Sequence, residues 1–162
     1  MDTVDKKTRS RIMASVKQYD TGPEMRLRHI LHRLGMRYRL HDKRLPGSPD
    51  LVFPRFRAVV FVHGCFWHVH NDCRFSTKPS SRKKLWEEKF KANKKRDNKN
   101  YHALEMSGWR VLVVWECAIK VRKDDQLIKL GFNVVHWLKS HNQYGEIGEK
   151  HAVSTVSRRK KT

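Results

Sequence analysis

The spacing of apolar residues predicts several helices along the chain. In the segment that opens with Gly22-Pro23-Glu24, apolar residues recur at helical spacing, at Met25, Leu27, Ile30, Leu31 and Leu34. Gly35 ends this pattern, because glycine readily takes the left-handed conformation that follows a helix. Similar reasoning predicts helices over residues 8–17, 80–107 and 124–140, the second with Ser80 or Ser81 as its cap.

Four apolar runs predict strands, over residues 37–41, 49–53, 57–62 and 109–115. The last two runs are continuous, which is typical of strands covered on both faces. The order helix, helix, three strands, helix, strand, helix predicts an α/β fold in which helices flank a central mixed sheet. We expect one domain over residues 1–141 and a polar, basic, disordered tail over residues 142–162.

The net charge points to a polyanionic partner. Lys and Arg number 36 against 16 Asp and Glu, which gives a formal net charge of +20. Self-repulsion of this size destabilises a compact chain, so nucleic acid is the first candidate partner and an anionic membrane the second. The membrane is the weaker candidate, because no apolar run approaches the roughly 20 residues that span a bilayer. The N-terminus has no apolar core of the signal-peptide kind, so we expect a cytoplasmic, nucleoid-associated protein.

All three cysteines can enter one metal site. Cys65, His70 and Cys73 lie within nine residues, and Cys117 follows the last predicted strand. Three cysteines and a histidine are a common tetrahedral ligand set for Zn²⁺, and four protein ligands leave no open position. The spacing therefore favours a structural zinc. Inert cysteines beside a surface histidine remain the alternative, since free cysteine often behaves as a small buried apolar residue.

A candidate active site lies near the ends of two predicted strands. Asp50 stands where many metal-dependent nucleases place an acid, and a carboxylate aimed at a phosphate suits Mg²⁺. The neighbouring strand lacks the usual Glu-x-Lys, so only the backbone carbonyl of Val62 could serve as a ligand there. His63 and His68 could transfer protons or stabilise the phosphate, and Glu24 could orient one of them. The alternative for Asp50 is an acid in a turn.

The loop and the long helix also carry candidate DNA contacts. Phe66 and Trp67 are consecutive aromatic residues among candidate ligands, and aromatic side chains can enter a base stack. Covering the cysteine cluster is their alternative role. One face of the long helix carries Trp86, Phe90, Asn93, Asp97, Tyr101 and Leu104. Nine Lys and Arg residues between positions 82 and 99 favour phosphate contact, although a basic helix face is often only solvated.

These residues resemble a known family, the very short patch repair (Vsr-type) mismatch endonucleases. The resemblance covers roughly residues 5–120, and its most specific segments are Gly-Cys-Phe-Trp-His at 64–68 and Trp-Glu-Cys at 115–117. It extends to Asp5-Lys6 with Thr8-Arg9-Ser10, Arg37 to Leu40, Leu45-Pro46-Gly47 with Pro49-Asp50, Arg96-Asp97, and Gly108 to Val111.

The resemblance implies a restriction-endonuclease-like fold that nicks one strand of double-stranded DNA beside a T:G mismatch formed when 5-methylcytosine deaminates. It implies catalytic Mg²⁺ at Asp50, a catalytic His68 supported by Glu24, a phosphate-stabilising His63, and structural Zn²⁺ on Cys65, His70, Cys73 and Cys117. It further implies an aromatic wedge and mismatch contacts formed by Phe66, Trp67, Trp86, Lys89, Asn93 and Met13. A monomer that is linked to a cytosine-5 methyltransferase and to mismatch-repair proteins would fit this family.

Overall fold

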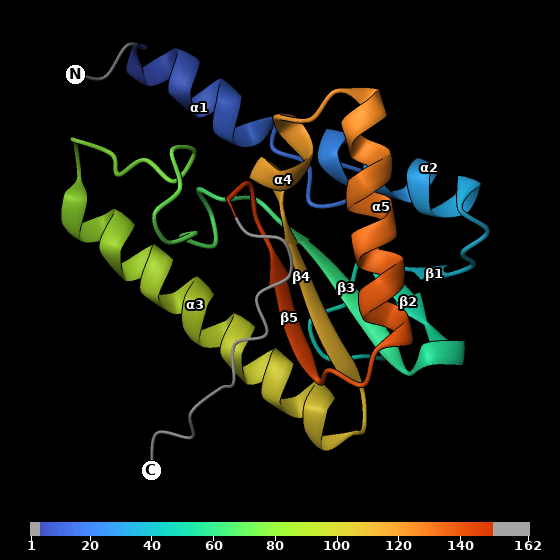
Figure 1. The fold of residues 1–162 in the computed structure, drawn as a ribbon. Coiled ribbons are helices and arrows are strands. Elements are labelled where there is room, and N and C mark those ends of the chain that lie inside the picture. The colour runs from blue at the N-terminus through green and yellow to red at the C-terminus, as the bar shows by residue number, and fades with distance from the viewer. Residues whose placement is uncertain (1–3, 151–162) are drawn as a thin grey trace.

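A computed structural model describes residues 4–150 of the chain as six helical segments and five strands (Figure 1). The helices are α1 (Lys6–Ala14), α2 (Gly22–Arg33), the short 3-10 helix η1 (Pro54–Phe56), α3 (Lys83–Met106), α4 (Glu116–Lys120) and α5 (Asp124–Lys139). The strands are β1 (Arg39–Leu40), β2 (Leu51–Phe53), β3 (Ala58–His63), β4 (Arg110–Trp115) and β5 (Tyr144–Ile147).

The strands form one mixed sheet in the order β1-β2-β3-β4-β5. The pairs β1–β2 and β2–β3 are antiparallel, whereas β3–β4 and β4–β5 are parallel. The mixed sheet with flanking helices confirms the α/β class. In the register, Leu51 lies opposite Val60 and His63 lies beside Trp115, so the start of β2 and the ends of β3 and β4 meet at one edge.

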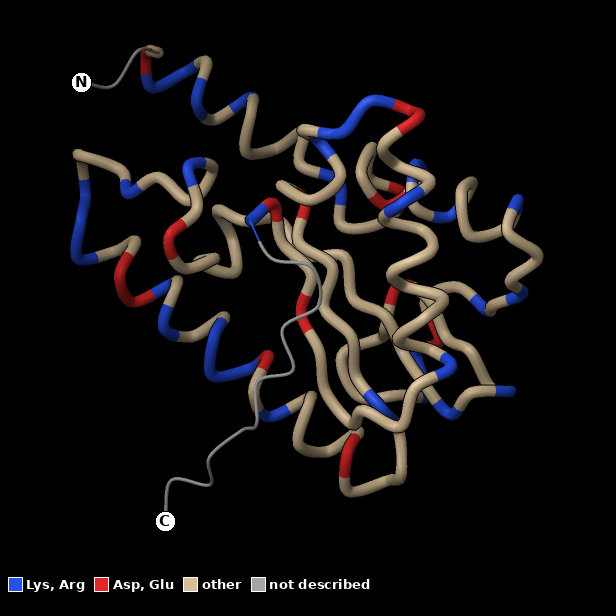
Figure 2. Tube along the Cα trace, viewed as in Figure 1, with Lys and Arg blue, Asp and Glu red and all other residues tan. Residues whose placement is uncertain are grey.

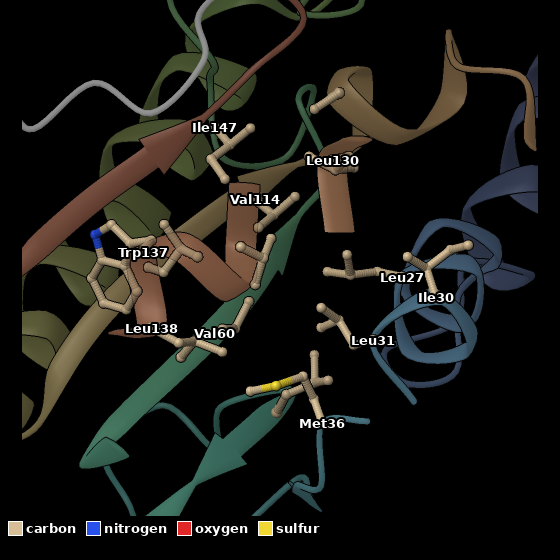
Figure 3. Packing of buried hydrophobic residues seen from close by; sticks show 14 of the residues in the cluster. Leu27, Ile30, Leu31, Met36, Val60, Val114, Leu130, Trp137, Leu138 and Ile147 are labelled. Carbon is tan, nitrogen blue, oxygen red and sulfur yellow. The ribbon is translucent and has the colours of Figure 1, made fainter. Parts of the chain in front are cut away.

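Helices cover both faces of the sheet, with α2, α4 and α5 on one face and α3 on the other (Figure 1). The larger apolar cluster joins the first face to side chains such as Leu27 and Trp137 (Figure 3). Tyr101 and Leu104 of α3 pack on the opposite face. Successive β4 residues alternate between the two clusters, which explains why this run reads as continuously apolar.

Side-chain caps fix the starts of the first two helices. Asp5 accepts a hydrogen bond from the Thr8 backbone N–H at 2.7 Å, so α1 begins two residues before the predicted start. Thr21 caps α2 and accepts from the Glu24 backbone N–H at 3.4 Å. The long helix α3 begins at Lys83 instead of at residue 80, and Arg82 precedes it in a left-handed conformation without a side-chain cap.

The predicted domain boundary at residue 141 is wrong, because Tyr144–Ile147 form β5 at the edge of the sheet. This strand pairs with β4. Gly145 leaves room for the Trp137 side chain of α5, because an added Cβ would lie 2.5 Å from Nε1 of Trp137. Short helix α4, which directly follows β4, was also not predicted. The remainder of the predicted tail, residues 151–162, lies outside the described residues.

Lys and Arg residues are dense on α1 and α3, the two helices on either side of the loop between β3 and α3 (Figure 2). The Arg9 guanidinium of α1 donates to the Ser81 hydroxyl at 3.2 Å, which ties α1 to the end of this loop. Within residues 4–150, none of the helices has the length and apolarity to cross a bilayer.

Candidate active site and cysteine–histidine cluster

Asp50 and the end of β3 lie side by side, as the sequence predicts. The antiparallel pairing of β2 with β3 brings them together, and Oδ2 of Asp50 accepts a hydrogen bond from the Val62 backbone N–H at 2.7 Å. Its side chain is 17% exposed. Asp50 therefore holds a fixed position beside a backbone segment rather than projecting freely from a turn.

Burial raises the pKa of Asp50 to about 7. The charge of Glu24 contributes to this rise in the pKa, whereas the hydrogen bond from Val62 and the charge of Arg28 oppose it. A buried carboxylate that is costly to ionise gains from a nearby cation, because the cation stabilises its charged form. The residues present thus fit a divalent cation at Asp50.

Two histidines meet at the same edge of the sheet. The rings of His63 and His68 lie edge to face, with centroids 3.7 Å apart. Nε2 of the buried His63 lies 2.7 Å from the Tyr101 hydroxyl, and its Nδ1 has no hydrogen-bond partner within residues 4–150. Burial, with the charges of His68 and His70, lowers the pKa of His63 well below its ordinary value, so this imidazole is neutral near pH 7.

His68 is paired with an acid from α3. Its Nδ1 lies 2.6 Å from Oδ2 of Asp97, so Nδ1 carries the proton of this hydrogen bond. Nε2 then has the lone pair in the neutral ring and can accept a proton, as in other base–carboxylate pairs. A cavity of about 270 Å³, lined by both side chains and by Tyr101, reaches this pair.

The acid that contacts His68 is Asp97, not Glu24 as predicted. Glu24 is buried, and its Oε1 lies 2.6 Å from Arg28 and 3.0 Å from Nε2 of His41. Glu24 therefore contacts a third histidine, His41, which lies beside Asp50. The sequence does contain a signal for Asp97, which with Asn93 is a polar residue on a mostly apolar face of α3, but nothing in the pattern assigns its partner.

Cys65, His70, Cys73 and Cys117 converge as predicted, with one ligand atom from each lying within 4.8 Å of the others. Nδ1 of His70 is 3.5 Å from Sγ of Cys65 and 3.4 Å from Sγ of Cys117. Hydrogen bonds from Cys65, His70 and the Glu149 backbone N–H lower the pKa of Cys117, whereas the neighbouring Cys117 raises that of Cys65.

The surroundings of this cluster hold the histidine in place. The rings of His70 and Trp115 stack 4.2 Å apart with an interplanar angle of 4°. Gly148, after β5, leaves room for this ring, because an added Cβ would lie 2.9 Å from Cε1 of His70. A set of three thiols and one imidazole suits the tetrahedral coordination of Zn²⁺ better than that of Mg²⁺, which requires oxygen ligands.

Phe66 and Trp67 pack against α3. The ring of Phe66 lies 5.2 to 5.3 Å from those of Trp67, Trp86 and Phe90. The four rings are all half-buried, so they retain exposed aromatic surface. The structure thus brings together the three aromatic residues predicted to contact DNA.

The other candidate DNA contacts divide into two groups. Nζ of Lys89 lies 5.5 Å from the ring centre of Trp86, and Nδ2 of Asn93 donates to the backbone carbonyl of Trp67 at 3.1 Å. Both residues therefore adjoin the aromatic cluster. Met13 is half-buried on α1, an element without fully buried residues.

The chain is similar to known DNA endonucleases. A family model described as DNA mismatch endonuclease Vsr matches residues 1–74. The chain is 43% identical to the DNA mismatch endonuclease Vsr of Escherichia coli over 122 residues, which cover 75% of this chain and 78% of that protein. It is 48% identical over 118 residues to the type II nicking enzyme V.XorIIP of Xanthomonas oryzae, with 73% and 86% covered. The nicking enzyme V.NmeAIP of Neisseria meningitidis is 44% identical, with 69% and 79% covered. The chain is therefore an endonuclease of the Vsr family.

Proposed function

We propose that this endonuclease nicks one strand of double-stranded DNA beside a T:G mismatch that arises from deamination of 5-methylcytosine. The main support is the meeting of Asp50, His63 and the His68–Asp97 pair at one edge of the sheet, next to the exposed aromatic cluster. The relative in E. coli is named a mismatch endonuclease.

The proposed chemistry is phosphodiester hydrolysis with Mg²⁺ held by Asp50 and the backbone carbonyl of Val62. Mg²⁺ bound there supplies a Lewis acid that activates water and neutralises charge on the leaving oxygen. His68 takes a proton from the attacking water at Nε2, and Asp97 stabilises the imidazolium that results. Neutral His63 donates a hydrogen bond to a phosphate oxygen from Nδ1, while Tyr101 holds its Nε2.

Zn²⁺ on the four Cys and His ligands would act structurally. It would join the loop after β3 to α4, the short helix that follows β4, because Cys65 and Cys117 lie on these two segments. The loop carries His68, Phe66 and Trp67, so this link would fix both the catalytic base and the aromatic wedge. The four ligands would leave no open position for a substrate.

Phe66, Trp67 and Trp86 would enter the base stack beside the mismatch, where a T:G mispair stacks less well than a Watson–Crick pair. Lys89, Asn93 and Met13 would contact the DNA nearby. Basic residues of α1 and α3 would bind phosphates and make affinity fall steeply with salt. We further propose that the protein acts as a monomer, together with a cytosine-5 methyltransferase that sets the flanking sequence and with mismatch-repair proteins.

A second candidate function is a nicking activity that recognises a sequence without requiring a mismatch, because several relatives are named only as type II nicking enzymes. An assay with purified protein and Mg²⁺ separates the candidates, using duplexes that carry T:G, other mismatches or T:A in varied flanking sequences. Nicking of T:G duplexes alone supports the first function. Equal nicking of paired DNA would contradict it in favour of the second.

A further inference from the structure

His41 lies directly behind Asp50, in a part of the molecule to which the family comparison assigns no role. We propose that His41 is a positioning residue: it connects the buried Arg28–Glu24 ion pair to Asp50 and fixes the orientation of the Asp50 carboxylate. This proposal rests on the function proposed above. The two side chains come from different segments, and Nδ1 of His41 is 3.7 Å from Oδ1 of Asp50.

The backbone of His41 is held in an unusual conformation. Its φ is +46°, in the left-handed region that is uncommon for residues other than glycine, although histidine enters it more often than most. This conformation costs roughly 1–2 kcal/mol and persists only where the surroundings enforce it. The His41 backbone N–H donates to the Asp50 carbonyl at 3.3 Å, so the strained residue is attached to the segment that carries the acid.

The side chain of His41 is fixed on its other side. Nη2 of Arg28 is 2.9 Å from Nε2 of His41, and the Tyr19 ring packs edge-on at 4.7 Å from the imidazole. Oε1 of Glu24 also lies 3.0 Å from this Nε2, so the Arg28–Glu24 pair holds one side of the ring and leaves Nδ1 on the other side. This Nδ1 is buried and has no hydrogen-bond partner within residues 4–150, and the Asp50 carboxylate is the acceptor that faces it.

The positive charge beside Asp20 and Glu24 comes from a side chain of the protein, Arg28. Asp20, Glu24 and His41 could hold a metal ion by their geometry. However, Nη2 of Arg28 lies 2.6 Å from both carboxylates, and the Arg28 side chain is 8% exposed. The guanidinium therefore fills this space and makes the group rigid.

Two contacts consequently limit the rotation of Asp50. The Val62 N–H donates to Oδ2, and Nδ1 of His41 lies 3.7 Å from Oδ1. Partners of this kind orient a metal-binding carboxylate, and their loss typically costs about 10- to 100-fold in metal affinity or activity. We therefore expect His41 to affect the chemical step and divalent-metal binding, but not DNA affinity.

The test uses His41→Ala and His41→Asn in the full chain, with exposed His29 of α2 replaced by alanine as the matched control. Asparagine tolerates positive φ, and its amide nitrogen is placed like Nδ1 of histidine. Nicking of a T:G duplex gives kcat and KM. The loss of the free Mn²⁺ EPR signal gives metal binding, and the part of this binding that Asp50→Asn removes reports on the site.

For His41→Ala we expect kcat to fall about 10- to 100-fold and Asp50-dependent Mn²⁺ binding to weaken by a similar factor, with KM for DNA nearly unchanged. His41→Asn should recover most of both values, and His29→Ala should match the natural chain. Unchanged kcat and Mn²⁺ binding in His41→Ala would overturn the proposal. So would a loss of thermal stability alone that asparagine does not repair. If the natural chain nicks paired DNA equally, only the mismatch function fails, because the effects of His41 remain measurable.

Discussion

The loop after β3 serves two regions that are organised in opposite ways. In the cysteine–histidine cluster, the four ligand atoms lie within 4.8 Å of one another, and Nδ1 of His70 contacts two of the sulfur atoms. At the active edge, each side chain instead has its own protein partner: Val62 for Asp50, Asp97 for His68 and Tyr101 for His63.

This difference separates stability from chemistry. A cluster of thiols that face one another is most stable when a metal holds them together, so its geometry should depend on the metal. The active edge is built by strand pairing and hydrogen bonds, so it should persist without Mg²⁺. Substitutions should therefore affect folding at the first region and rate at the second.

The largest effect should come from Asp50→Ala. We expect nicking to fall by more than about 1,000-fold, beyond what a single lost stabilising contact usually costs, because the main metal-binding carboxylate is removed. DNA binding should persist, since the change also removes a negative charge. Gel-shift and nicking assays on one T:G duplex measure both properties, and normal nicking would show that the active site lies elsewhere.

Cys117→Ala should instead lower metal content and stability. We expect Zn²⁺ to fall below one per chain and the free energy of unfolding to drop by more than about 4 kcal/mol. Cys73→Ala is the matched comparison, because Cys73 is only half-buried and adds less to the core. Elemental analysis and thermal unfolding measure the effects. Full zinc occupancy in either variant would remove that cysteine from the ligand set.

The pKa of Asp50 predicts a pH dependence of stability in zinc-loaded protein without Mg²⁺. Because the folded pKa is raised to about 7 from an ordinary value of 3.8, folding favours the protonated acid. The stability from this group is complete below about pH 4 and is lost as the pH rises through 7, by up to about 4 kcal/mol. Asp50→Asn, which cannot ionise, should flatten this decline in urea unfolding curves from pH 5 to 8. A parallel decline in both proteins would contradict the assignment.

Asp97→Asn should produce a smaller loss of rate, about 100-fold in kcat, because asparagine cannot stabilise the imidazolium of His68. Zinc content and unfolding should change little. The exposed Asp125→Asn on α5 controls for the loss of one negative charge. Single-turnover nicking measures the effect, and equal rates in both variants would mean that Asp97 only packs against the loop.

The pairing of Asp50 with the end of β3 could be predicted, because the hydrophobic pattern places both at strand termini. Convergence of the four Cys and His residues could also be predicted, since three of them lie close together in the sequence and Cys117 follows the end of β4. The partner of His68 could not. Glu24 and Asp97 are both acids on predicted helices, and residue type alone does not tell which helix turn faces the loop.

By itself, the sequence predicted the α/β class, most of the longer helices to within about three residues, a polyanionic partner, and the grouping of the four Cys and His residues. These properties follow from local periodicity, net charge and short spacings, which are readable along one segment. Only the tertiary structure decided that Asp97 serves His68, that Arg28 and Glu24 reach His41, and that Tyr144–Ile147 form a strand. The physical reason is that these contacts join residues brought together by packing across the sheet, and β5, short and interrupted by Gly145, becomes a strand only when β4 supplies its hydrogen-bond partners.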